Sequence, residues 1–456
     1  FASSAASDVY KRQINNHMYL LMIIVFILGY AAIAFEHNLK IDKAAAALVT
    51  GVICWVFFVF GGVETHQIEH DLLNHIGEIS SILFFLLGAM TIVELIDTHG
   101  GFNIITDKIA TQNKVIALWI ICLMTFFFSA ILDNLTTSIV MISLLRKLIK
   151  DKQVRWLFAG MVIISANSGG AFSPIGDVTT TMLWIGGQVS VSHIISSLFL
   201  PSIVSLLAPL LFLSWKLDGK IQQPEVIDSK KNQAISRREQ SSILAIGVLG
   251  LIFVPIFKTV THLPPFMGMM FSLGILWLVT DFMHRKKPFE IRRKLSVIGV
   301  FKKVDIASVL FFLGILLAVA GLQSGGQLND MALGLDKTFG TDSETGIYIV
   351  GSLIGLLSAI IDNVPLVAAV MGMYDLVPGT LFAQDALFWN FLAYCAGTGG
   401  SVLIIGSAAG VAVMGLEKIP FGWYLKKISL LALIGYICGI LAYVLQAWVI
   451  STFNII

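Results

Sequence analysis

The chain has 456 residues, of which 57% are hydrophobic and only 13% are charged, and its formal net charge is +2. This composition excludes an ordinary soluble globule and predicts a polytopic membrane protein whose first partner is membrane lipid. The charged residues form no basic face, which argues against nucleic acid as a partner.

Residues 1–13 begin without an initiator methionine and do not merge with the apolar run that follows them. We interpret them as a leader that is not native to the protein and leave them out of the reasoning on the fold.

Apolar segments of membrane-spanning length then follow one another to the end of the chain. We expect them at about 17–35, 44–60, 79–96, 115–150, 156–187, 194–215, 242–258, 266–281, 305–322, 346–376, 386–416 and 428–452.

Two of these segments are too long for a single span. A straight helix over 115–150 would measure roughly 50 Å, against a bilayer core of about 30 Å. Its middle carries Asp133 and Asn134, and the middle of 346–376 repeats them as Asp362 and Asn363. We therefore predict that each segment is a re-entrant hairpin, shielded by protein or lining a cavity.

The loops between the segments differ in charge, which predicts the orientation of the chain. Lysine and arginine are concentrated in 146–155, 216–240, 284–303 and 418–427, which we expect in the cytoplasm. The acidic stretches 61–78 and 329–346 are expected outside. His66, His70 and His75 lie in the first of these stretches; a metal site or pH sensor there is the alternative to an ordinary solvated loop, which we favour.

The chain repeats itself at a nearly constant offset, which indicates a duplication. Asp362 follows Asp133 by 229 positions, and Gly399 follows Gly169 by 230. Each half then contains about five spans, a hairpin and a broken helix, and an odd number of spans makes the second half inverted. The predicted division is 14–215 for the first repeat, 216–240 for a cytoplasmic linker and 241–456 for the second repeat.

Glycine, proline and polar residues interrupt the segment after each hairpin. The first interruption is the stretch 165–177, which contains Asn-Ser-Gly-Gly-Ala-Phe-Ser-Pro-Ile-Gly-Asp at 167–177 and is followed by Thr179, Thr180 and Thr181. Its echo is the stretch 396–401, which contains Gly-Thr-Gly-Gly-Ser at 397–401, together with Gly406 and Ser407. Unwound backbone of this kind coordinates sodium in transporters. The alternative is close helix packing through small residues, and we favour the functional interpretation.

The aspartates of the two hairpins also have two interpretations. Asp133 and Asp362 could each cap the half-helix that follows, but serine or asparagine would cap as well without a charge. No lysine or arginine lies near the middle of either segment. A bound cation or a proton is therefore the partner that we favour for these costly carboxylates.

Together, the two Asp-Asn signatures, the stretch at 167–177 and its echo resemble the NhaD-type sodium/proton antiporters of the ion transporter superfamily. The resemblance covers nearly the whole chain after residue 13. It implies two inverted repeats, a scaffold part that forms a homodimer, and a transport part that moves as an elevator.

The resemblance also implies the residues of an ion site. One departure concerns the second hairpin tip, which has Val364-Pro365 where the first has Leu135-Thr136, so hydroxyl ligands are not expected there. Sodium is expected at Asp133 and Asp362. The implied site residues are Asp133, Asn134, Thr136 and Thr137 at one tip, Asp362 and Asn363 at the other, and Asn167, Ser168, Asp177, Thr398 and Ser401 from the broken helices.

The resulting prediction is an all-α secondary transporter, not an enzyme, that needs no cofactor and exchanges sodium or lithium for protons. The expected location is a bacterial cytoplasmic (inner) membrane, with a role in pH homeostasis. Two alternatives come from the same superfamily, arsenite or antimonite efflux and sodium-coupled dicarboxylate transport. Two aspartates without a neutralising cation argue against the dicarboxylate, because an anion must bind there.

Overall fold

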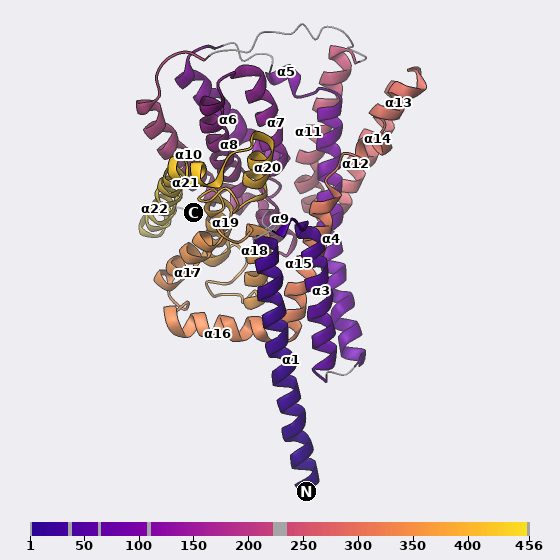
Figure 1. The fold of residues 1–456 in the computed structure, drawn as a ribbon, viewed down its shortest axis with the longest axis vertical. Helices are drawn as coiled ribbons and strands as arrows, with labels where there is room; N and C mark the ends of the chain where they lie inside the picture. The colour runs from indigo at the N-terminus through magenta and orange to yellow at the C-terminus, as the bar shows by residue number, and fades with distance from the viewer. Residues whose placement is uncertain (1, 35–38, 63–64, 107–110, 222–234, 454–456) are drawn as a thin grey trace. The chain divides into compact units, whose positions relative to one another are not determined.

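Helices account for most of the described chain in the computed structural model, which describes residues 2–34, 39–62, 65–106, 111–221 and 235–453. Within these ranges no strand is found beyond an isolated bridge between Asn113 and Lys220. Eight of the described helices are long and apolar enough to cross a membrane. The chain is thus an all-α polytopic membrane protein, as the composition predicted (Figure 1).

Two compact units make up the structure, and each takes residues from both halves of the sequence. Unit 1 is Phe1–Leu83, Asp305–Val350 and Val364–Phe382, and unit 2 is Phe84–Val304, Gly351–Asn363 and Ala383–Ile456. The two units are defined by their internal packing and do not coincide with the two halves of the sequence. The inverted repeats therefore stay a prediction. Most of the predicted linker, at 222–234, lies outside the described residues.

Unit 1 is built around a tightly packed pair of helices, α3 and α15. Asp42 begins α3 by accepting a hydrogen bond from Ala44 N at 2.8 Å. Within the pair, Trp55 Nε1 donates to the backbone oxygen of Leu317 at 2.9 Å, which satisfies a polar group inside an apolar contact. The helices of unit 1 are α1 (Ala2–Ala34), α3 (Lys43–Phe60), the first part of α4 (Thr65–Thr98), α15 (Ile306–Ser324), α16 (Gln327–Phe339), the first part of α17 (Glu344–Leu357) and most of α18 (Asn363–Met373).

The acidic stretch at 61–78 is not the loop that the sequence predicted. Helix α4 already begins at Thr65, so His66, His70 and His75 lie on a helix that continues to Thr98. Polar pairs one turn apart, such as Asn74 Nδ2 and His70 Nδ1 at 3.2 Å, are compatible with a helix that extends beyond the apolar span. Among the described residues no group of three or more histidine, cysteine or acidic side chains is placed to hold a metal ion.

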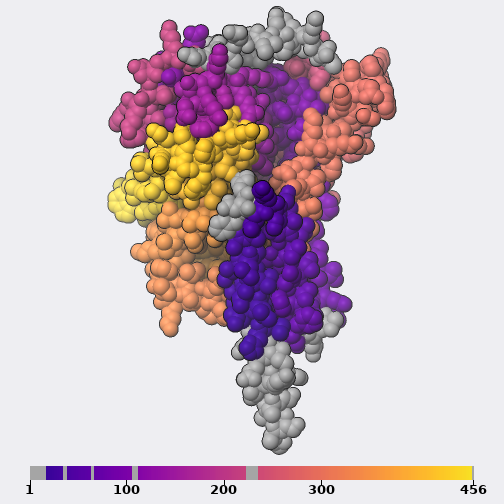
Figure 2. All heavy atoms as spheres, in the orientation of Figure 1, coloured from indigo at the N-terminus to yellow at the C-terminus, as the bar shows by residue number. Residues whose placement is uncertain are grey.

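Unit 2 is built around two central helices, α8 and α19. Nearly every residue of α19 is buried, and so is α8 from Phe158 to Ala171. Helices α6, α7, α10 and α20 contact α8, and α10 also packs along α22. Figure 2 shows the yellow C-terminal residues directly against the magenta residues of the first half. The helices of unit 2 are the rest of α4 and α17, α5 (Asn103–Thr106), α6 (Lys114–Leu132), α7 (Asn134–Leu148), α8 (Lys152–Ala171), α9 (Val178–Ile185), α10 (Val191–Lys216), α11 (Arg237–Thr261), α12 (Pro265–His284), α13 (Phe289–Leu295), α14 (Val297–Phe301), α19 (Leu387–Gly399), α20 (Ala408–Glu417), α21 (Phe421–Lys427) and α22 (Ser429–Phe453).

Helix breaks occur where the sequence predicted them. Asp133 separates α6 from α7, and residues 358–362 separate α17 from α18. The later segments are interrupted at 172–177, between α8 and α9, and at 400–407, between α19 and α20. Whether the two hairpins enter from opposite sides of a membrane stays a prediction.

Candidate ion-binding site

The first hairpin tip is a single strained residue. Asp133 ends α6 and begins α7 with φ 90° and ψ 156°, a conformation that residues other than glycine rarely adopt. Its carboxylate accepts hydrogen bonds from the backbone N and the Oγ1 of Thr136, both at 2.8 Å. Asp133 therefore caps α7, and its two oxygens retain further lone pairs for a cation.

Asp177 is the carboxylate on which both tips converge. It is 1% exposed and caps α9, where its Oδ1 accepts from the N and Oγ1 of Thr179 at 2.9 and 2.8 Å. Its Oδ2 accepts from Asn134 Nδ2 of the first tip at 2.7 Å. Asn363 Nδ2 of the second tip lies 3.4 Å from each of its oxygens. Two tips that are far apart in the sequence thus meet at one buried acid.

Asn167 joins the two broken helices to the first tip. Its Oδ1 accepts from Asn134 Nδ2 at 3.1 Å, and its Nδ2 donates to the hydroxyl oxygens of Ser401 and Ser407 at 2.9 Å each. All four side chains are buried. Asn134, Asn167, Asn363, Asp177, Ser401 and Ser407 therefore form one connected polar cluster, which we call the Asp177 cluster.

Three other predicted site residues make no hydrogen bond to the Asp177 cluster among the described residues. Ser168 Oγ pairs with Ser205 Oγ at 2.7 Å, and Thr398 Oγ1 donates to the backbone oxygen of Tyr394 at 2.6 Å. Thr137 Oγ1 is buried without a hydrogen-bond partner among the described residues. These three hydroxyls do not join the Asp177 cluster in the structure, so their predicted role as ligands stays untested.

Asp177 is one of three carboxylates at this site and interacts with both of the others. Asp177 interacts electrostatically with Asp133 and with Asp362, which is half-buried at the second tip. Like charges in a low-dielectric interior repel strongly. This arrangement favours a cation at the site and disfavours an anion.

Close backbone contacts hold the broken helices against the hairpins. A Cβ added to Gly169 of α8 would collide with the backbone oxygen of Phe126 in α6. A Cβ added to Gly399 of α19 would collide in the same way with the backbone oxygen of Gly355 in α17. Glycine at these positions allows two backbones to approach more closely than any other residue would permit.

Ser407 and Thr179 were recognised as parts of the polar interruptions, but they were not among the predicted ion-site residues. Ser407 stands 230 positions after Asp177, and it caps α20 with a similar backbone conformation, φ −146° and ψ 154° against φ −141° and ψ 141°. The offset of the two halves, which pairs Ser407 with the predicted site residue Asp177, was therefore the signal that would have added Ser407 to the site. Thr179 is the natural partner of an aspartate cap two residues before it.

Comparison with known proteins agrees with the family that the sequence predicted. A family profile described as "Citrate transporter" matches residues 30–390. The sodium/proton antiporters 1 and 2 of Arabidopsis thaliana are 47% and 44% identical to the chain, in each case over 92% of it, and the matches cover 71% and 98% of those proteins. The Na(+)/H(+) antiporter NhaD of Alkalimonas amylolytica is 30% identical over 96% of the chain and 92% of its own length.

The profile covers well over half of the chain, and these relatives match it almost from end to end. With its two Asp-Asn helix breaks and its two polar interruptions, the chain belongs to the citrate transporter family and is a member of its NhaD-type sodium/proton antiporters.

Proposed function

We propose that the protein is a secondary transporter that exchanges sodium, or lithium, for protons. The observation that carries this proposal is the buried carboxylate of Asp177, which is bound by amides and hydroxyls from both tips and from α9. In the described part of the chain, no lysine or arginine forms an ion pair with it. The named relatives are sodium/proton antiporters, which supports the same choice of ions.

The chemistry follows from the ligands available. Sodium is a hard cation that prefers oxygen, and the cluster offers carboxylate, amide and hydroxyl oxygens. A proton competes for the same carboxylate oxygens, so each ion excludes the other. A cation that binds Asp177 displaces an amide donor such as Asn134, whose side chain can then turn its own oxygen toward the ion.

In this proposal Asp133 and Asp362 add two further negative charges beside Asp177. A carboxylate inside a membrane is costly to move, and neutralisation by sodium or a proton lowers that cost. An elevator movement that occurs only when the acids are neutralised is therefore part of the proposal. The division of the chain into two compact units supports a transport part distinct from a scaffold.

Neither alternative substrate is favoured by an observation. A dicarboxylate would have to bind where three carboxylates already repel one another. Arsenite or antimonite efflux has no relative with a matching name among those described above.

The homodimer and the bacterial inner membrane also remain proposals. Two of the relatives described above come from a plant, so a plant membrane is the competing location. Blue native electrophoresis of the purified protein tests the dimer, and fractionation of source cells tests the location.

Reconstitution tests the central proposal. The purified protein in proteoliposomes is expected to release protons from an acidic lumen when sodium or lithium is added outside, and not when choline is added. Proton flux driven by citrate or arsenite, with none driven by sodium, would overturn the proposal.

A further inference from the structure

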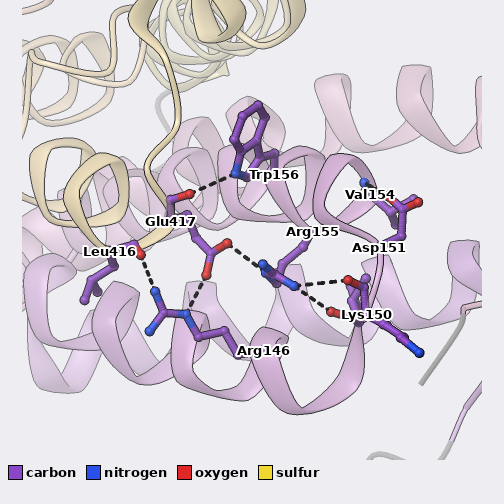
Figure 3. A network of polar contacts seen from close by, with 9 residues as sticks. Arg146, Lys150, Asp151, Val154, Arg155, Trp156, Leu416 and Glu417 are labelled. Carbon is purple, nitrogen blue, oxygen red and sulfur yellow. Dashed lines mark hydrogen bonds and ion pairs between the residues drawn. The ribbon is translucent and has the colours of Figure 1, made fainter. Parts of the chain in front are cut away.

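A second polar cluster lies at the far ends of three helices that also meet at the Asp177 cluster. Glu417, the last residue of α20, is 1% exposed at its side chain. Its Oε1 accepts from Arg146 Nε of α7 and its Oε2 from Arg155 Nε of α8, each at 2.7 Å (Figure 3). Trp156 Nε1 donates to the backbone oxygen of Glu417 at 3.0 Å, and Arg146 also bonds the backbone oxygen of Leu416. We call Glu417, Arg146 and Arg155 the Glu417 cluster.

Local helix stability does not explain two of these three charges. Arg155 lies in the first turn of α8, where the positive end of the helix dipole disfavours a cation. Glu417 lies at the C-terminus of α20, where the negative end disfavours an anion. Both charges are at the unfavourable end of their own helix, so their pairing across helices is what stabilises them.

Each of the three helices runs from the Glu417 cluster to the Asp177 cluster. In α7 the two ends are Arg146 and Asn134, and in α8 they are Arg155 and Asn167. Twelve residues separate the ends of each pair, which is about 18 Å of helix at 1.5 Å per residue.

The third helix, α20, runs in the same way from Glu417 to its cap, Ser407. At the ion-site end, Asn167 bonds both Asn134 and Ser407. All three helices are therefore tied together at both ends.

We propose that Glu417, Arg146 and Arg155 are positioning residues for ion binding. This inference rests on the proposed function. By fixing the far ends of α7, α8 and α20, the Glu417 cluster fixes the spacing of the side chains that surround Asp177. None of the three residues touches the ion.

The test compares two variants that make the same change, glutamate to glutamine, at two ion pairs of unit 2. Glu417→Gln removes the one negative charge of the Glu417 cluster and keeps the shape of the side chain. Glu239→Gln is the matched control, because Glu239 pairs with Lys287 at 2.9 Å at the start of α11 and belongs to none of the three helices.

In proteoliposomes, Glu417→Gln is expected to raise the KM for sodium about tenfold, as a shift of ligand geometry by a fraction of an ångström does. Its maximal rate is expected to change less, and Glu239→Gln is expected to retain the parental KM. Sodium-dependent flux with a parental KM in a folded Glu417→Gln variant would overturn the inference.

Hydrogen–deuterium exchange supplies a readout that does not need transport. Amides of 408–417 are expected to exchange faster in Glu417→Gln than in the parent, while Glu239→Gln leaves them unchanged. If the parent shows no sodium-dependent proton flux, the proposed function fails, and the exchange result alone decides whether the three helices are held by Glu417.

A conservative variant covers the case in which Glu417→Gln does not fold. Arg155→Lys keeps the positive charge but loses the planar guanidinium. It is expected to raise the KM for sodium about threefold, between the parent and Glu417→Gln. A parental KM together with parental exchange of 408–417 in this variant would contradict the inference.

Discussion

The two interrupted helices of unit 2 restart in the same way, with a capping residue in an extended conformation, but the cap is an aspartate in one and a serine in the other. Asp177 and Ser407 stand 230 positions apart, and each caps the half-helix that follows, α9 or α20. Ser407 Oγ accepts from Gly410 N at 3.2 Å, which shows that a hydroxyl is sufficient for the cap. The negative charge of Asp177 is therefore not needed to begin a helix, and it requires another explanation.

Asp177→Asn should have the largest effect, because the amide keeps the size of the side chain and its capping oxygen but removes the charge. A hydrogen bond to a charged group is worth roughly 1.5–3 kcal/mol, so sodium-dependent proton flux should fall on the order of 100-fold. Flux is measured in proteoliposomes with equal amounts of inserted protein.

Ser407→Thr is the control at the other cap, since threonine keeps the hydroxyl that caps α20 and accepts from Asn167. It should retain most of the flux. If Asp177→Asn and Ser407→Thr behave alike, the difference in charge between the two caps has no functional meaning.

The two tip asparagines should differ less strongly. Asn134 Nδ2 lies 2.7 Å from Asp177 Oδ2 and also bonds Asn167, whereas Asn363 Nδ2 lies 3.4 Å from the same carboxylate. We expect Asn134→Ala to raise the KM for sodium about tenfold, and Asn363→Ala about threefold. The reverse order would show that the second tip, not the first, carries the tighter ion contact.

The close backbone approaches at the two interrupted helices should be of equal importance. Gly169→Ala and Gly399→Ala each place a methyl group against a backbone oxygen, of Phe126 and Gly355 respectively. Overpacking of this kind costs about 1–3 kcal/mol. Thermal unfolding in detergent should show a similar decrease in the unfolding temperature for both variants. A decrease in only one variant would show that the two close approaches are not equivalent.

The smallest expected effect concerns the pH dependence of folding stability, which His99 influences from outside the Asp177 cluster. His99 is fully buried, its Nε2 lies 2.9 Å from His284 Nε2, and burial lowers its pKa from the usual 6.5. Below about pH 6.5 the unfolded chain binds a proton at His99 that the folded protein does not. The stability contributed by neutral His99 is thus fully present above this pH and is lost as the pH falls.

The loss from this one group amounts to at most about 1.4 kcal/mol per pH unit. His99→Gln, which does not titrate, should therefore show a shallower fall of the unfolding temperature between pH 8 and pH 5 than the parent. Glu239, Lys287 and Lys303, the charged groups that act on His99, remain in both proteins. Identical slopes would show that His99 is protonated as readily in the folded protein as in the unfolded chain.

Much of the fold could be predicted from the sequence, because a bilayer imposes its constraints locally. An apolar run of sufficient length must form a helix there, since no other structure satisfies the backbone of a single segment. The same reasoning placed the breaks, because Asp133 and the glycine-rich stretch at 167–177 interrupt such runs. The same reasoning did not predict the start of α4 at Thr65, because the first residues of this helix are polar and precede the apolar run.

The sequence by itself determined the class of the protein, the approximate spans, the positions of the breaks and most residues of the Asp177 cluster. Only the tertiary structure decided that Asp177, and not the tip acids, receives amides from both tips, and that Glu417 is buried between two arginines. The physical reason is distance along the chain. Asn363 and Asp177 are 186 residues apart and Arg146 and Glu417 are 271 apart, and neither hydropathy nor helical periodicity carries information over such separations.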